Sequence, residues 1–294
     1  MMAMSIHRYV LHNGRIREAS EGGLFPGQLG LLAGWGVFST LRVMDGTVFA
    51  WERHWERMSR DARLLNVAMP PDADAVEHDL LRLIDSNKAP DCTLRLVVVR
   101  NGGGLWEGPS SGRESDVIAL TAGLKQWGSS VRLGVQPNAR HAASDFTRAK
   151  MLSWAPNLRW FERAQEQGLD EVILLNEFGN VAECTSANIF AAIGDRVFTP
   201  PLSDGCLPGI TREVLLEEVR VPGIEVRERS LTVEELEKAD EVFITSTTRN
   251  LLKVREVAGR KLKGDDTVRE RLSRAFQSYL ENDIARRKRT PVVV

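Results

Sequence analysis

The feature that most constrains the fold is residues 168–190, GLDEVILLNEFGNVAECTSANIF, which predict two strands joined by a tight turn. Residues 172–175 form a short apolar run, residues 176–180 supply turn-forming Asn and Gly, and Val181 resumes the apolar pattern. Glu183 follows the turn closely. A carboxylate in a buried strand is costly unless it meets a cation or a hydrogen-bond donor. Glu183 is therefore either a solvated residue of a surface hairpin or a group held in place for function.

A second feature, TPPLSDGCLPGITR at residues 199–212, predicts an extended segment, a turn and the start of a helix. Pro200-Pro201 fixes the extended segment, and Pro208-Gly209 turns the chain. A helix that opens at Ile210 presents free backbone N–H groups, the Thr211 hydroxyl and the positive end of the helix dipole. Such a start suits a phosphate group, although the same residues also describe an ordinary helix N-cap.

Lys150 precedes both features and is followed by the apolar-rich residues 151–154. A lysine with apolar neighbours can have a lowered pKa, so that its neutral amine forms a Schiff base with a carbonyl. Most lysines are instead solvated, and this residue alone does not decide between the two.

Together, these features resemble the class IV (fold type IV) pyridoxal-phosphate enzymes. The resemblance rests on their order: a lysine, then E…G-x-V-x-E-x-x-x-x-N-x-F, then T-P-P-L…L-P-G-I-T-R, and it covers nearly the whole chain. The family includes branched-chain aminotransferases, D-amino-acid aminotransferases and aminodeoxychorismate lyases. It implies a two-domain fold of α+β or α/β class, the D-amino-acid aminotransferase-like fold, with pyridoxal 5′-phosphate as cofactor. We expect an N-terminal α/β domain at residues 1–124 and a C-terminal domain at 125–294 that carries the cofactor lysine.

The resemblance also implies roles for individual residues. Lys150 holds the cofactor and moves the substrate proton, and Glu183 pairs with the pyridine nitrogen. The phosphate-binding residues are Arg57 of an H-x-x-R sequence, the amides of Ile210 and Thr211, and the hydroxyl of Thr247 in TSTTR. A guanidinium suits a phosphate dianion because it can donate two parallel hydrogen bonds. Without the downstream motifs, Arg57 would be interpreted as an exposed residue on a charged helix face.

Two predicted strands decide the reaction subclass. The substrate-binding residues that we expect are Phe38, Arg42, Arg95, Thr247 and Thr248. Alternation places Phe38 and Arg42 on one face of their strand. In branched-chain enzymes a tyrosine lies two residues before the arginine that matches Arg95, and this chain has Thr93 there. We favour an aminotransferase acting on L-branched-chain, or related, amino acids and 2-oxoglutarate, with Phe38 as the apolar wall of the pocket.

Three alternatives remain open. GVFSTLRV and LRLVVVR resemble strands of 4-amino-4-deoxychorismate lyase. A D-amino-acid or (R)-amine transaminase is a second alternative, although D-amino-acid enzymes have an arginine and a histidine where this chain has Leu105, Trp106 and Glu107. A catalytically silent binding protein on the same fold is the third. The presence of both Lys150 and Glu183 argues against it.

The other segments predict a mixture of helices and strands. Strands are expected in a hairpin at 6–19, around an Asp45-Gly46 turn, and at 93–104, 116–124 and 241–254, and helices at 72–88, 213–220, 231–240 and 265–287. Thr232 and Glu235 predict a capping box at the start of the third of these helices.

The composition disfavours several classes of protein. A net charge of −1 over 294 residues gives no electrostatic basis for binding nucleic acid or an anionic membrane. The apolar runs are too short to span a bilayer, and the N-terminus lacks a signal-peptide pattern. The three cysteines are widely spaced without metal-ligand spacing, so we expect no metal and a reduced, cytoplasmic compartment. The expected partners are an amino acid, a 2-oxo acid and a second copy of the chain in a homodimer or higher homo-oligomer.

Overall fold

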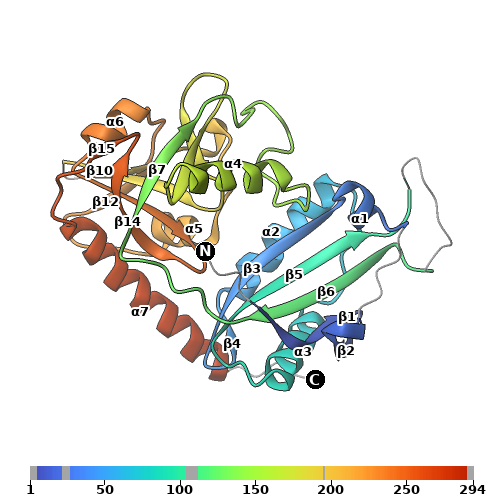
Figure 1. Cartoon of the computed structure of the whole chain (residues 1–294). Coiled ribbons are helices and arrows are strands. Elements are labelled where there is room, and N and C mark those ends of the chain that lie inside the picture. The colour runs from blue at the N-terminus through green and yellow to red at the C-terminus, as the bar shows by residue number, and fades with distance from the viewer. Residues whose placement is uncertain (1–4, 22–26, 104–111, 195, 290–294) are drawn as a thin grey trace. The chain divides into compact units, whose positions relative to one another are not determined.

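The structure, a computed structural model, describes residues 5–21, 27–103, 112–194 and 196–289 (Figure 1). The chain divides into two compact units. The first unit comprises Met1–Lys125, Ala149–Trp154 and Glu281–Val294, and the second comprises Gln126–Arg148 and Ala155–Leu280. Lys150 therefore groups with the first unit. The domain boundary predicted at residue 124 stays a prediction.

The first unit contains one sheet and the helices packed on it. Its elements are β1 (Ile6–His12), β2 (Arg15–Glu18), the 3-10 helix η1 (Ala19–Glu21), α1 (Leu29–Ala33), β3 (Gly36–Met44), β4 (Thr47–Val48), α2 (Trp51–Leu64), α3 (Ala73–Ser86), β5 (Cys92–Arg100) and β6 (Ser115–Ala122). The strand order is β2-β1-β6-β5-β3-β4, and neighbouring strands are antiparallel. The predicted hairpin at 6–19 is confirmed, with Asn13 and Gly14 both at positive φ, as a tight hairpin turn requires.

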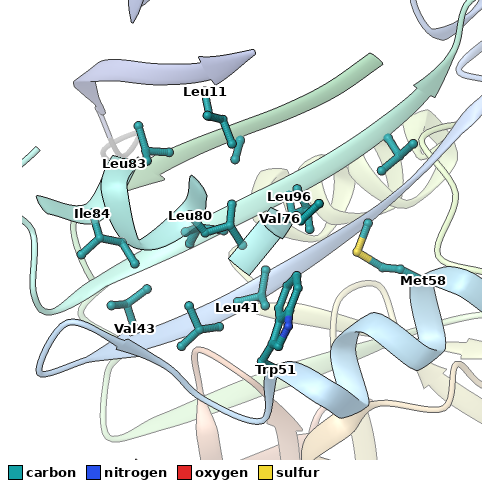
Figure 2. Close-up of a cluster of buried hydrophobic side chains, with 14 of the residues drawn as sticks. Leu11, Leu41, Val43, Trp51, Met58, Val76, Leu80, Leu83, Ile84 and Leu96 are labelled. Atoms are coloured by element: carbon teal, nitrogen blue, oxygen red, sulfur yellow. The ribbon is translucent and has the colours of Figure 1, made fainter. Parts of the chain in front are cut away.

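The core of the first unit lies on one face of this sheet. Figure 2 shows side chains of α2 and α3, among them Trp51, Met58 and Leu80, packed against strand residues such as Leu41 and Leu96. Because side chains alternate along a strand, Leu41 faces this core while Phe38, Thr40 and Arg42 of β3 face the other way. The helices thus cover one face and leave the other to the residues expected to bind substrate.

The second unit contains the elements that follow in the chain. They are β7 (Ser130–Gln136), α4 (Ala155–Glu166), β8 (Glu171–Leu175), β9 (Val181–Cys184), β10 (Asn188–Ile193), β11 (Arg196–Thr199), the 3-10 helix η2 (Leu202–Asp204), α5 (Ile210–Glu217), β12 (Glu225–Glu228), α6 (Val233–Lys238), β13 (Glu241–Ser246), β14 (Asn250–Val257) and β15 (Arg260–Lys261). The last helix is α7 (Thr267–Arg289), whose residues from Glu281 onward group with the first unit.

The sheet of the second unit mixes parallel and antiparallel pairs. Its strand order is β12-β11-β10-β13-β14-β7-β8-β9, with β15 paired to β14. β7 runs parallel to both β14 and β8, whereas β8 and β9 form the antiparallel hairpin predicted from residues 168–190. The Thr232 and Glu235 capping box is present at the start of α6. These local predictions are confirmed.

Candidate active site

Lys150 is fixed by backbone hydrogen bonds from two elements of the first unit. Residues 149–154 run beside β3, where the Phe38 N–H donates to the Lys150 carbonyl over 3.0 Å. On the other side, the Lys150 N–H donates to Oδ2 of Asp61, on α2, over 2.9 Å. The backbone of the predicted cofactor lysine is thus tied to a strand through its C=O and to a helix through its N–H.

The Lys150 amine lies among aromatic rings. Its Nζ is 4.6 Å from the centroid of the Phe38 ring and 5.8 Å from that of Trp154, and these two rings meet edge to face at 5.9 Å. The guanidinium of Arg95 lies 4.0 Å from the same Phe38 centroid. The structure therefore brings together three of the residues predicted from the sequence, Lys150, Phe38 and Arg95. Trp154 joins them.

Two arginines lie on the sheet face opposite the core. In the register of β3 and β5, Arg95 pairs with Thr40, and Arg42 pairs with Thr93. Burial lowers the pKa of the Arg95 guanidinium from its ordinary value. Nε of Arg42 and Oγ1 of Thr93 are buried and have no hydrogen-bond partner among the residues described. This face can therefore supply positive charge and unused polar groups to an anionic ligand.

Arg57, the predicted phosphate ligand, is buried on α2. It donates to Oγ of Ser39 over 2.7 Å, and that hydroxyl lies 2.7 Å from Nδ1 of His54. Because Ser39 accepts from Arg57, its own proton is available to donate to Nδ1 of His54. Burial, followed by the charges of Arg57 and Lys150, holds the pKa of His54 well below its ordinary value. Ser39 was missed from the sequence, where only its strand position was apparent.

In the second unit, Glu183 lies in β9 and is only 6% exposed. Its Oε1 accepts from Nε and Nη2 of Arg140 over 3.0 and 2.8 Å, and its Oε2 accepts from the Leu207 N–H over 3.1 Å. Nη1 of Arg140 also donates to Oδ1 of Asn157 over 3.3 Å. The alternative of a solvated surface carboxylate is therefore wrong: Glu183 is a buried carboxylate held by a cation.

The helix expected at Ile210 is present, since α5 begins there with Gly209 as its N-cap residue. A side chain at Gly209 would place its Cβ 2.1 Å from Oδ1 of Asn188, so any larger residue would force the Asn188 side chain to move. Asn188 also donates to the Leu207 carbonyl over 2.8 Å. Oγ1 of Thr211 is buried and lacks a hydrogen-bond partner within the described part of the chain. An unused hydroxyl in the first turn of a helix suits an anion.

Thr247 and Thr248 lie in the turn between β13 and β14. Trp127 supports this turn, because its Nε1–H donates to the Thr248 carbonyl over 3.1 Å. The guanidinium of Arg249 lies 3.9 Å from the Trp127 ring centroid and donates to the Ser186 carbonyl over 2.8 Å. The turn is thereby connected to the segment that follows Glu183 in the sequence.

A buried ion pair completes this connection. Arg249 lies 3.3 Å from Oε2 of Glu171, which also accepts from the Ser186 hydroxyl over 3.0 Å. Burial lowers the pKa of Arg249 from its ordinary value. Sequence analysis singled out neither residue for this role, because the two are far apart in the chain. Leu105, Trp106 and Glu107, which count against a D-amino-acid enzyme in the sequence, lie outside the described residues.

A family model described as amino-transferase class IV matches residues 36–257. The chain belongs to the class IV aminotransferase family. A putative branched-chain-amino-acid aminotransferase of Methanocaldococcus jannaschii is 30% identical over 251 residues, which cover 84% of this chain and 87% of that relative. A D-alanine aminotransferase of Bacillus licheniformis is 29% identical over 279 residues, which cover 94% of this chain and 96% of that relative.

A solved structure extends the likeness to the fold. The branched-chain aminotransferase of Thermoproteus uzoniensis with norvaline is similar to this class IV aminotransferase with a TM-score of 0.85 and 26% identity, over 94% of this chain and 96% of that one. The predicted family, enzyme class and fold are thereby confirmed. Among the described residues, no helix has the length and apolar character needed to cross a membrane. The roles of the individual site residues stay predictions.

Proposed function

We propose that this class IV aminotransferase uses pyridoxal 5′-phosphate to move an amino group between L-branched-chain, or related, amino acids and 2-oxoglutarate. Family membership supports the reaction class, and the relative from Methanocaldococcus jannaschii bears the name of a putative branched-chain enzyme. The observation that carries the proposal is the cluster of Lys150, Phe38 and Arg95. It offers an amine for the transfer, an aromatic surface for a hydrocarbon side chain and a cation for a carboxylate.

The side chains present suit the cofactor. A carboxylate has about four lone-pair positions, and Glu183 uses three of them for two N–H groups of Arg140 and one of Leu207. One position remains for the N–H of a pyridinium ring. The buried Thr211 hydroxyl, unpartnered among the described residues, suits a phosphate oxygen. The Lys150 amine supplies the group that binds the cofactor covalently.

Each residue would serve one part of the reaction. When bound, pyridoxal phosphate supplies an electron sink for the negative charge that develops on the substrate Cα. Lys150 would hold the cofactor and, once released by the substrate amine, carry the proton between the substrate Cα and the cofactor C4′. Glu183, held by Arg140, would keep the pyridine nitrogen protonated. The phosphate would be bound by Arg57, the Ile210 and Thr211 amides and the Thr247 hydroxyl.

Substrate recognition would depend on a cation that can leave an aromatic ring. A cation–π contact is worth about 0.5–2 kcal/mol, so Arg95 can exchange its contact with Phe38 for a substrate carboxylate at little cost. With a hydrocarbon substrate, Phe38 would supply the apolar surface. Arg42 would add positive charge, and Thr247 and Thr248 would provide further polar contacts.

Two alternatives have an observation in their favour. The buried Thr93 hydroxyl has no partner among the described residues, and it stands where branched-chain enzymes have a tyrosine. An unpartnered hydroxyl at this position would suit a substrate with polar groups, such as that of 4-amino-4-deoxychorismate lyase. A D-amino-acid transaminase, or the related (R)-amine transaminase, is supported by the 29% identity to a D-alanine aminotransferase.

We also propose a cytoplasmic location and a homodimer or higher homo-oligomer. The three cysteines are free and buried, which agrees with a reducing compartment. Burial raises the pKa of Cys92 and of Cys206 to about 12, so neither thiol is readily ionised. Size-exclusion chromatography with light scattering would test the oligomer, and a monomeric mass would contradict it.

A donor screen tests the proposed reaction. The purified protein, loaded with pyridoxal phosphate, would be supplied with L-leucine, L-isoleucine, L-valine, D-alanine or an (R)-amine, each with 2-oxoglutarate or pyruvate. We expect glutamate to form from 2-oxoglutarate with the L-branched-chain donors. Glutamate formed from 2-oxoglutarate with D-alanine but not with the L-branched-chain donors, or alanine formed from pyruvate with the (R)-amine alone, would overturn the substrate assignment. Pyruvate release from aminodeoxychorismate without any transfer to 2-oxoglutarate would favour the lyase.

A further inference from the structure

Asp61 contacts the backbone of the lysine expected to bind the cofactor. Its carboxylate is almost fully buried, at 1% residue exposure. Oδ2 accepts the Lys150 N–H over 2.9 Å, while Oδ1 accepts from Nη2 and Nε of Arg60 over 2.6 and 3.0 Å. Each oxygen therefore has a different partner, and the one that meets Lys150 is separate from the one that meets Arg60.

This contact fixes the segment that carries Lys150 from the side opposite β3. The pairing with β3 uses the Lys150 carbonyl, which accepts from Phe38, and the Leu152 N–H, which donates to Gly36. It leaves the Lys150 N–H to be satisfied elsewhere, and a buried N–H without a partner is costly. The carboxylate of Asp61 supplies a charged acceptor, which makes a stronger hydrogen bond than a neutral oxygen would.

The same helix also carries the predicted phosphate ligand. Arg57 and Asp61 are four residues apart on α2, so their side chains lie on one face of the helix. Arg57 contacts Ser39 of β3, and Asp61 contacts the backbone of Lys150. A lysine and an arginine that bind two groups of one small molecule must keep a constant separation. Helix α2 can keep it, because it carries Arg57 and contacts the Lys150 backbone through Asp61.

We propose that Asp61 is a positioning residue for Lys150, which acts through the backbone N–H and sets the placement of the amine relative to α2. The inference rests on the proposed function, because it takes Lys150 as the cofactor lysine. According to this proposal, Asp61 both forms an ion pair with Arg60 and influences how fast the Lys150 amine reacts with the cofactor. A purely structural Asp61 would affect the stability of the fold and leave the reactivity of Lys150 unchanged in any variant that folds.

Three substitutions separate these roles. Asp61→Asn keeps an oxygen that can accept the Lys150 N–H but removes the charge. Asp61→Ala removes the acceptor, and Asp61→Ser replaces it with a hydroxyl too short to reach, in case the alanine variant does not fold. Asp85→Ala is the matched control, because Asp85 is an exposed residue of α3 in the same unit. Circular dichroism and the melting temperature of the apoprotein establish that each variant is folded.

Two quantities are measured. The first is the rate at which the apoprotein and pyridoxal phosphate form the lysine-bound species, monitored through the absorbance of that species. The second is the pH at which this absorbance reaches half of its full change. We expect Asp61→Ala and Asp61→Ser to slow the reaction roughly tenfold or more, as loss of a charged hydrogen bond implies, and to shift the midpoint. We expect Asp61→Asn to restore the rate to within about threefold of wild type, since its hydrogen bond is retained. The Asp85→Ala control should match wild type in both.

The outcomes distinguish this inference from the proposed function. Reduction of the wild-type protein with borohydride, followed by peptide mapping, identifies the lysine that carries the cofactor. A cofactor adduct on another lysine, or none, would overturn the proposed function and this inference with it. An adduct on Lys150, with folded Asp61→Ala or Asp61→Ser reacting at the wild-type rate and pH midpoint, would overturn the positioning role alone. Failure of Asp61→Asn to recover the rate would also overturn it, because the hydrogen bond would then not be the cause.

Discussion

The guanidinium of Arg140 donates both Nε–H and Nη2–H to one oxygen of Glu183, over 3.0 and 2.8 Å, inside the second unit. Both side chains are largely buried, at 16% and 7% side-chain exposure. The pair leaves the second oxygen, Oε2, with the Leu207 N–H and room for one more donor. This geometry pairs the carboxylate with a cation and still leaves it able to accept a hydrogen bond from a ligand.

Replacing Glu183 by glutamine should weaken the charge that this site offers to a pyridine nitrogen. We expect the variant to bind the cofactor but to carry out each half-reaction roughly tenfold or more slowly, because one charge-assisted hydrogen bond of about 1.5–3 kcal/mol is lost. Stopped-flow absorbance of each half-reaction measures this. Glu162→Gln, at an exposed position of α4, is the control. Rates near those of wild type in Glu183→Gln would remove this residue from the mechanism.

Arg140→Met should destabilise the protein more than an exposed arginine substitution does. It leaves the buried Glu183 carboxylate without its cation, and breaking a buried pair in this way costs about 3–5 kcal/mol. Urea unfolding of the apoprotein measures the change. Arg159→Met, which removes a half-exposed arginine paired with Glu162 and Glu166, should cost much less, because exposed ion pairs contribute little to stability. An equal loss of unfolding free energy in the two variants would mean that the Arg140–Glu183 ion pair stabilises the fold no more than a surface ion pair does.

Arg95→Ala or Arg42→Ala should impair the half-reaction with 2-oxoglutarate much more than the one with leucine. The distal carboxylate of 2-oxoglutarate needs a cation, and its loss should raise the barrier by about 1.5–3 kcal/mol, roughly tenfold or more. Leucine has no such group and should lose much less. Stopped-flow measurement of both half-reactions, with the exposed Arg82→Ala as control, tests the difference. Equal losses for the two substrates would place these arginines in structural roles.

His54 should make the folded protein sensitive to mild acid. Burial, then the charges of Arg57 and Lys150, holds its folded pKa well below the ordinary value of 6.5. Below about pH 6.5 the unfolded chain therefore binds a proton that the folded chain excludes. The stability that the neutral His54 contributes is present above that pH and is lost as the pH falls.

The loss should approach about 1.4 kcal/mol per pH unit for this one group. We expect urea unfolding between pH 7 and 5 to show a smaller decrease in stability for His54→Gln than for wild type. His141→Gln, at a histidine whose side chain is 70% exposed, is the control variant. An unchanged slope in His54→Gln would contradict the burial of a neutral histidine at this site.

Local signals predicted most of the fold. The Asn13-Gly14 turn, the capping box of Thr232 and Glu235 and the helix start at Ile210 each depend on a few adjacent residues, and each is present in the structure. Such features are set by backbone preferences and short-range hydrogen bonds, which a sequence displays directly.

The partners of the site residues were not predictable in the same way. Arg140 reaches Glu183 across 43 residues, Asp61 reaches the Lys150 backbone across 89, and Arg249 reaches Glu171 across 78. No periodicity or spacing relates such residues, because tertiary packing brings them together. The sequence therefore indicated which residues bear the chemistry, while the groups that hold them became apparent from the structure.

The most direct test of the account is the identity of the lysine that carries the cofactor. Wild-type protein loaded with pyridoxal phosphate would be reduced with borohydride, digested and analysed by mass spectrometry, beside Lys150→Ala and a control variant, Lys263→Ala, at a lysine distant in sequence. We expect the phosphopyridoxyl group on the peptide that contains Lys150, in wild type and Lys263→Ala alike, and no adduct or turnover in Lys150→Ala. An adduct on a different lysine in wild type, or a reducible adduct that persists in Lys150→Ala, would contradict the account.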